Sequence, residues 1–439
     1  MSSQDEDLLR QLYQSLAQVE LEPSDPRYVP LHEHKDCFGP DIVKELVRDV
    51  SWATEGSIFF LSGLRGSGKS TQLLRLRDNL AQQGFAAVRL DAEDYLNLRE
   101  PIDIVDFLFF LVGGISDAVD EANWLGPQSA VSRGWEKLRR WLSALPKRIA
   151  LTPEATVGVE LPLGVSTTAA SLKAELRSDE SFVGQLRRFL EGRLSELTAE
   201  SNRIVSELVD DLREAWHETG RDWKGLVVLV DSLDHVRGAD FKRVRQALVD
   251  LFDKQPASIT LGACRTVFIV PPWIQVDYAP VRKLANIKIS HHPGSGSDRT
   301  PFEPGYATLR EVLERRCPPG TELTAFLEEQ DIEGYIRDSG GHLRDLLRLV
   351  RGASVAADSL PFPPEAVARG RQELRDGLIP IAEDGVECLR LVVETHQLPL
   401  RTQDAWESLA GLLDLHLILG YKNGETWYDV HPLIRADLD

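Results

Sequence analysis

Nine consecutive residues near the start of the chain constrain its fold more than any other stretch. An apolar run, Ser57-Ile58-Phe59-Phe60-Leu61, precedes them, and a stretch with helical spacing from Gln72 to Gln82 follows. The nine residues are Gly63-Leu64-Arg65-Gly66-Ser67-Gly68-Lys69-Ser70-Thr71, which match the pattern G-x-x-x-x-G-K-[ST]. A strand, a glycine-rich turn and a helix in this order predict a phosphate-binding loop, or P-loop.

The residue types of this loop suit a nucleotide with Mg²⁺. Glycines let the backbone turn so that successive N–H groups point at a phosphate, and the helix N-terminus adds partial positive charge. Lys69 is placed to reach the β- and γ-phosphates of ATP. Ser70 offers a hydroxyl oxygen to Mg²⁺, which prefers oxygen ligands. We therefore predict ATP and Mg²⁺ as cofactors.

A second acidic site is expected, because the metal must also be held from the other side. The continuous apolar run from residue 225 to 230 ends in Asp231, as a buried parallel strand does when its tip meets a ligand. We predict Asp231 as a magnesium-side and catalytic residue. Asp234 follows three residues later and is a candidate for orienting water or a neighbouring subunit. The plainer alternative is an aspartate that ends a strand in a turn.

Together, the loop and the strand Val227-Val228-Leu229-Val230-Asp231 resemble the additional-strand ATPases, in the branch that contains AAA+ initiators and STAND signalling ATPases. The resemblance implies an α/β fold of three layers, α/β/α, around a parallel sheet of order 5-1-4-3-2, with a helical lid and a C-terminal winged-helix domain. It implies a γ-phosphate sensor at Arg265, at the end of an expected strand over 258–266. It also implies a second, lid-borne sensor at Arg344, with Arg348 as the next choice.

Two positions depart from the family pattern. The family has an arginine beside the adenine where this chain has Pro40, in Cys37-Phe38-Gly39-Pro40, so adenine contacts there are in doubt. AAA+ enzymes carry a glutamate directly after the strand aspartate, whereas this chain has Ser232, which is no carboxylate base. We therefore expect slow ATP hydrolysis, which suits a switch better than a motor.

The chain is long enough for several domains. We expect an N-terminal helix and linker (1–36), an ATPase domain (37–298) with an insertion at about 122–222, a lid (299–376) and a winged helix (377–439). Further strands are expected over 86–91 and 285–289, and Arg282 is a candidate arginine finger. Within the insertion, a basic helix with Trp135 and Trp141 and an alternating segment over 157–172 favour packing over a nucleic-acid or membrane surface.

The C-terminal region has helical patterns over 385–395 and 404–415, then two strand-like runs joined by Asn423-Gly424, a strong hairpin signal. From residue 378 on it carries four basic and eleven acidic side chains, a net charge of −7, which opposes DNA binding. His431 matches the STAND histidine that contacts the ADP β-phosphate, although a core or turn histidine fits the pattern equally well.

The formal charge of the whole chain is −19, its four cysteines show no CxxC spacing, and no apolar run has membrane-spanning length. We expect a cytoplasmic protein. Our main functional hypothesis is a slowly hydrolysing switch ATPase that controls its own nucleotide-dependent assembly or a separately encoded effector protein, in a bacterial defence or signalling context by resemblance. The alternative is a DNA-binding initiator or loader, and a small-molecule kinase is the third possibility.

Overall fold

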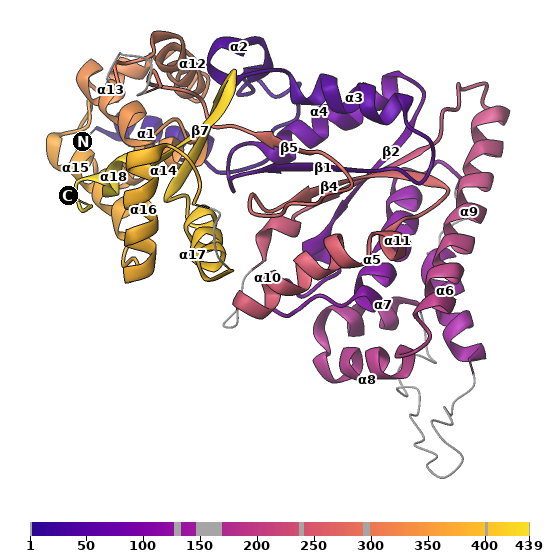
Figure 1. Cartoon of the computed structure of the whole chain (residues 1–439). Coiled ribbons are helices and arrows are strands. Elements are labelled where there is room, and N and C mark those ends of the chain that lie inside the picture. Colours follow the sequence, from indigo (N-terminus) through magenta and orange to yellow (C-terminus); the bar gives the residue numbers. More distant parts are fainter. Residues whose placement is uncertain are drawn as a thin grey trace.

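A five-stranded parallel sheet forms the centre of the molecule (Figure 1). The computed structural model describes residues 2–126, 133–145, 169–236, 241–292, 299–399 and 403–438. The sheet order is β2-β3-β4-β1-β5, the predicted order written from the other edge, so the predicted fold class is confirmed. The strands are β1 (Ile58–Gly63), β2 (Ala86–Asp91), β3 (Leu226–Asp231), β4 (Cys264–Val270) and β5 (Val281–Leu284).

Both faces of the sheet are buried, which explains the unbroken apolar strands. Along β3, Val228 and Val230 belong to one hydrophobic core, whereas Val227 and Leu229 belong to a second core on the opposite face. Alternate side chains of a strand point to opposite faces. Every side chain of a strand that is covered on both faces is therefore buried, which favours apolar residues throughout.

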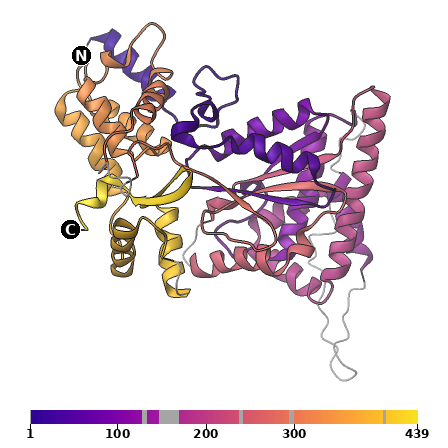
Figure 2. The same cartoon turned by 45° about the horizontal axis from the view of Figure 1, so that its top comes forward.

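Helices cover the two faces. One face packs against α3 (Ile42–Trp52) and α4 (Lys69–Gln82), and the other against α5 (Ile104–Glu121), α9 (Leu194–Glu218), α10 (Phe241–Val249) and α11 (Pro256–Ile259). A π-helical segment, Asp250–Lys254, continues α10. Helix, sheet and helix therefore form the three expected layers (Figure 2).

Two expected strands are placed wrongly along the chain by sequence reasoning. The segment 258–266 is not one strand, because α11 ends at Ile259 and β4 begins only at Cys264. The fifth strand is Val281–Leu284 and not 285–289. Residues beyond β5 instead donate backbone hydrogen bonds to three distant parts of the chain: Asn286 to Gly420, Ile287 to Gly341 and Lys288 to Cys37. These bonds tie the segment to distant residues and not to a neighbouring strand of the sheet.

The insertion adds helices on the α5 face: α6 (Arg133–Ala144), α7 (Ala169–Ser178) and α8 (Glu180–Leu190), followed by α9. Trp135 is buried against α5, where a Cβ on Gly113 would lie 2.1 Å from its ring. The predicted packing role of this basic helix is therefore confirmed at Trp135. The alternating segment over 157–172 lies largely outside the described residues, up to 168.

The lid and the C-terminal module lie beside one edge of the sheet (Figure 1). The lid contains α12 (Glu303–Glu314), α13 (Glu329–Asp338), α14 (Leu343–Ala356) and α15 (Pro364–Asp376). The N-terminal helix α1 (Ser3–Ser15) packs on α14. The short helix α2 (Lys35–Phe38) precedes α3. We define the C-terminal module as α16 (Glu383–Thr395), α17 (Gln403–Asp414), the hairpin β6 (Ile418–Asn423) and β7 (Glu425–Val430), and α18 (Pro432–Arg435). The predicted hairpin is confirmed; the winged-helix assignment stays a prediction.

Among the described helices, none combines the length and the apolar character needed to cross a membrane.

Candidate nucleotide-binding site

The predicted P-loop lies between the end of β1 and the start of α4. Gly66 and Gly68 have φ angles of 90° and 96°, and the N-cap residue Gly68 is in the left-handed region. Side chains other than glycine rarely adopt this conformation. Gly66 and Gly68 are therefore required by the backbone path, and α4 points its N-terminus into the loop.

Lys69 is held inside the loop by three oxygen atoms. Its ammonium donates to the carbonyls of Gly63 (2.9 Å) and Leu64 (2.7 Å), and lies 2.9 Å from Asp234 Oδ2. The Lys69 and Asp234 side chains are only 5% and 4% exposed. Burial raises the pKa of Asp234, but Lys69 and His235 outweigh it and hold that pKa below its ordinary value. Asp234 thus serves as the counter-ion of the P-loop lysine.

Asp231 lies beside Ser70, the P-loop residue whose hydroxyl is predicted to bind Mg²⁺. Its Oδ1 is 3.4 Å from Ser70 Oγ and accepts from the Ser232 backbone N–H at 2.8 Å. Its Oδ2 accepts from Arg89 of β2, at 3.1 Å from Nε and 2.6 Å from a terminal nitrogen. Burial raises the pKa of Asp231, and the attraction of Arg89 opposes that shift. The hydroxyl and carboxylate predicted to hold Mg²⁺ therefore meet.

Arg89 is one of the residues at this site that sequence reasoning missed. It pairs at once with Asp231 and with Glu20, whose two oxygens lie 2.6 Å from its terminal nitrogens. Glu20 belongs to the segment that follows α1, 69 residues before Arg89. The only signal was a charged residue in the middle of a largely apolar strand, where such residues are unusual.

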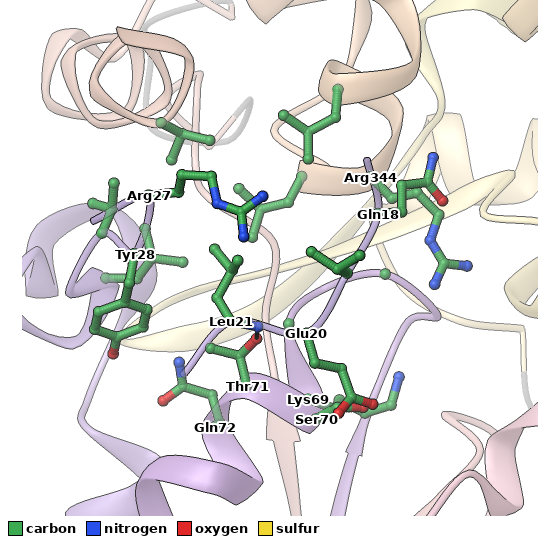
Figure 3. Close-up of a pocket in the computed structure, with 18 of the residues that line it drawn as sticks. Gln18, Glu20, Leu21, Arg27, Tyr28, Lys69, Ser70, Thr71, Gln72 and Arg344 are labelled. Carbon is green, nitrogen blue, oxygen red and sulfur yellow. Dashed lines mark hydrogen bonds between the residues drawn. The ribbon is translucent and has the colours of Figure 1, made fainter. Parts of the chain in front are cut away.

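The N-terminal segment closes one side of the pocket above the P-loop (Figure 3). The Leu21 backbone N–H donates to Thr71 Oγ1 at 3.4 Å, and Tyr28 and Leu31 line the same cavity. The predicted adenine-side residues 37–40 are not among those that line it. Sequence reasoning treated residues 18–31 only as a helix end and linker, because no local pattern there indicates a ligand.

Two residues at the N-terminus of α14 lie directly on the P-loop. A Cβ on Gly66 would lie 2.5 Å from Arg344 Cβ and 2.6 Å from its Nε. His342 donates from Nε2 to the Arg65 carbonyl at 3.0 Å. Burial and the neighbouring Arg65 lower the pKa of Arg344. The structure therefore brings the predicted lid arginine to the loop, and it adds His342, which sequence reasoning did not single out.

Behind that contact, the lid meets the C-terminal module through buried titratable side chains. Asp345 Oδ2 lies 2.6 Å from His342 Nδ1 and 3.6 Å from both His416 Nδ1 and His431 Nε2. Despite burial, His342 and the other two histidines hold the pKa of Asp345 well below its ordinary value, so its carboxyl is ionised. Burial and His342 lower the pKa of His416 to about 3, so that ring is neutral.

Arg265 does not belong to this site, and its prediction as a γ-phosphate sensor is wrong. It is the second residue of β4, and its guanidinium donates to the carbonyls of Ala53 and Lys224. The last residue of β4, Val270, pairs with Ser62 at the P-loop edge. Five residues of strand separate the two edges by about 16 Å. The error follows from placing Arg265 at the end of its strand when it lies at the beginning.

Arg282, the candidate arginine finger, pairs with Asp49 and Glu45 of α3 within the same chain. Its guanidinium therefore already has two carboxylate partners within this chain.

Comparison with known proteins does not assign a family. No family model matches the chain, and no curated protein matches it. Among solved structures, the ORC2 protein of Aeropyrum pernix, solved in ADPNP–ADP complexes, is 13% identical with a TM-score of 0.40, over 97% of this chain and 94% of that one. CDC6P from Pyrobaculum aerophilum is 12% identical with a TM-score of 0.35, over 97% and 96%. At these scores the likeness carries no argument, and the fold and the site rest on this chain's own geometry.

Proposed function

We propose that this chain is an ATP-binding ATPase in which the bound nucleotide sets the position of the lid and the C-terminal module. One observation carries the proposal: α14 places His342 and Arg344 on the P-loop, and the same turn of α14 contacts the C-terminal module through Asp345. These shared contacts support the proposal that a phosphate entering the loop shifts α14 and, through Asp345, the C-terminal module.

The residues present fit a magnesium nucleotide. Ser70 and Asp231 would hold the metal, because a hydroxyl and a carboxylate oxygen already approach within 3.4 Å. The bound metal would neutralise charge on the phosphates. Lys69 would exchange its Asp234 and carbonyl partners for phosphate oxygens, and Arg344 would add a second cation on the lid side.

Hydrolysis is proposed to be slow. Ser232, not a carboxylate, follows Asp231 and has a left-handed backbone with a φ of 67°. The next acidic side chain, Asp234, is engaged by Lys69. A carboxylate held by a lysine accepts a proton from water poorly, because the positive neighbour favours its ionised form. Slow turnover leaves time for the triphosphate-bound conformation to be recognised.

The output of the switch is proposed to be a protein interaction: self-assembly or the control of a separately encoded effector. The net charge of −7 on the C-terminal region from residue 378 supports a protein partner over a nucleic-acid one.

A DNA-binding initiator or loader is the second candidate. The ORC2 and CDC6P structures are nearer to it than to a signalling switch, but at their TM-scores they do not decide between the two. Duplex DNA binding measured over a range of salt concentrations separates the candidates. Affinity that falls steeply with salt supports the loader, and absence of binding at low salt removes it.

The first test of the proposal is ATP binding by calorimetry, with light scattering in ADP and in a slowly hydrolysed ATP analogue with Mg²⁺. Lys69→Ala is expected to abolish ATP binding. A mass increase specific to the triphosphate indicates self-assembly, whereas an unchanged mass directs attention to a partner protein. Unchanged ATP affinity in Lys69→Ala contradicts the proposed function.

A further inference from the structure

The buried junction between the lid and the C-terminal module has the composition of a transition-metal site. Among the described residues, His342, Asp345 and His416 form the group of histidine and carboxylate side chains whose ligand atoms all lie within 4.8 Å of one another. The side chains of His342 and Asp345 are fully buried, and that of His416 is 9% exposed. Two imidazoles and one carboxylate are ligands that suit zinc and its neighbours.

The spacing between His416 and Asp345 fits a metal better than it fits a hydrogen bond. Ligands bonded to tetrahedral zinc at about 2.0–2.1 Å lie about 3.4 Å from one another. His416 Nδ1 lies 3.6 Å from Asp345 Oδ2, which is close to that separation and too long for a hydrogen bond. An ion bound to all three side chains would replace the 2.6 Å hydrogen bond between His342 Nδ1 and Asp345 Oδ2, and these two atoms would move apart by about 0.8 Å.

Two of the three side chains also carry a buried polar atom that is unsatisfied. Asp345 Oδ1 and His416 Nε2 are buried and have no hydrogen-bond partner within the part of the chain that the structure describes. Arg348 approaches Asp345 Oδ1 only to 3.6 Å. Leaving a buried polar atom without a partner is unfavourable. A cation would compensate the buried carboxylate, which hydrogen bonding leaves half satisfied.

His342 has the hydrogen bond expected of a metal ligand. Metal-binding histidines commonly donate their other ring N–H to a backbone carbonyl, which fixes the ring. His342 donates from Nε2 to the Arg65 carbonyl of the P-loop and turns Nδ1 toward the cluster. His342 Nδ1 lies 2.6 Å from Asp345 Oδ2, so the ring nitrogen that would bind the ion already faces the second proposed ligand.

His431 takes a different role. Its Nδ1 accepts the backbone N–H of Leu433 at 3.3 Å, so its ring proton is on Nε2, the atom that faces Asp345 Oδ2. A protonated nitrogen does not bind a metal, and His431 is therefore a neighbour that donates toward the carboxylate. Three protein ligands remain, with a fourth position left for water.

We propose that His342, Asp345 and His416 bind one zinc-class divalent ion that joins the lid to the C-terminal module. His342 and Asp345 begin α14, whereas His416 follows α17. The ion would therefore hold the C-terminal module against the lid and, through the Arg65 carbonyl, against the P-loop. This inference concerns a site separate from Ser70 and Asp231 and does not depend on ATP hydrolysis.

The test uses the full chain after EDTA treatment and dialysis, without nucleotide and with excess Mg²⁺. Zn²⁺ is titrated by calorimetry and Co²⁺ by visible absorption. We expect one equivalent of either ion, a Co²⁺ absorption of four-coordinate intensity, and a higher Tm with Zn²⁺.

Two substitutions and a matched control complete the test. His416→Gln and Asp345→Asn are expected to weaken Zn²⁺ binding at least about 10–100-fold. His217→Gln removes an exposed histidine at the end of α9 and is expected to bind like wild type. The proposal is overturned if wild type binds no stoichiometric Zn²⁺ or Co²⁺, or if both substitutions leave binding unchanged. If a variant does not fold, the wild-type stoichiometry and the Co²⁺ spectrum decide.

Discussion

The pairing of Lys69 with Asp234 leads to a prediction that separates the stability of the fold from its nucleotide chemistry. Lys69→Met keeps the length of the side chain but removes its charge. Asp234 would then remain buried without the cation that lies 2.9 Å from it. Breaking a buried ion pair on one side costs about 3–5 kcal/mol. Coulomb's law at an effective dielectric constant of about 20 gives a similar size, about 6 kcal/mol at this distance.

The cost depends on pH, and its sign follows from the two pKa values of Asp234. In wild type that pKa is depressed, so the pair stabilises the fold above the unfolded value and the contribution is lost as pH falls through the folded value. In Lys69→Met burial dominates and the pKa rises, so stability is lost as pH increases through the new value. The wild-type part of the difference therefore persists down to about pH 4, and the difference should grow further as pH rises from there toward the raised pKa of the variant, reaching its full size at neutral pH.

The assay is the thermal unfolding midpoint between pH 4.5 and 8, followed by far-UV circular dichroism. A cost of about 3–5 kcal/mol corresponds to a decrease of roughly 6–20 °C at neutral pH for a domain of this size. The double variant Lys69→Met/Asp234→Asn should recover much of that loss and show little pH dependence, yet still fail to bind ATP. A decrease that is constant from pH 5 to 8, or no recovery in the double variant, would refute the reasoning.

Three further substitutions test individual contacts. Gly66→Ala would place a Cβ 2.5 Å from Arg344 at a φ of 90°, so it should lower the free energy of unfolding by about 1–3 kcal/mol and weaken ATP binding. Gly184→Ala, which has open space around its Cβ, is the control in thermal unfolding and calorimetric titration. Arg89→Met removes the cation that pairs with Asp231 when no Mg²⁺ is bound. The Tm of this variant should therefore rise more on addition of magnesium nucleotide than the Tm of wild type does. An equal rise would contradict the role of Arg89. Arg265→Ala removes hydrogen bonds to Ala53 and Lys224 and should lower Tm while leaving ATP affinity unchanged; a large loss of affinity would restore the sensor hypothesis.

Local patterns in the sequence were sufficient for the core of the site. The P-loop, the strand that ends at Asp231, the strand Ala86–Asp91 and the Asn423-Gly424 hairpin all lie where the sequence predicts them. Each depends on interactions between near neighbours: glycine backbone freedom, apolar runs that need burial, and a tight turn. The sheet order followed from the family resemblance that these motifs carry.

Contacts across long stretches of chain were decided only by the tertiary structure. Glu20, Arg89 and Asp231 come from three distant segments, and the cluster around Asp345 unites α14 with His416 and His431. No periodicity marks such residues, because ion pairs and metal ligands need proximity in space and not in sequence. Arg265 shows the converse. Its residue type suggested a sensor. Because β4 begins at Cys264, however, Arg265 lies at the edge of the sheet opposite the P-loop, where its guanidinium donates hydrogen bonds to backbone carbonyls. The sequence determined the chemistry of the loop, and packing decided which side chains surround it.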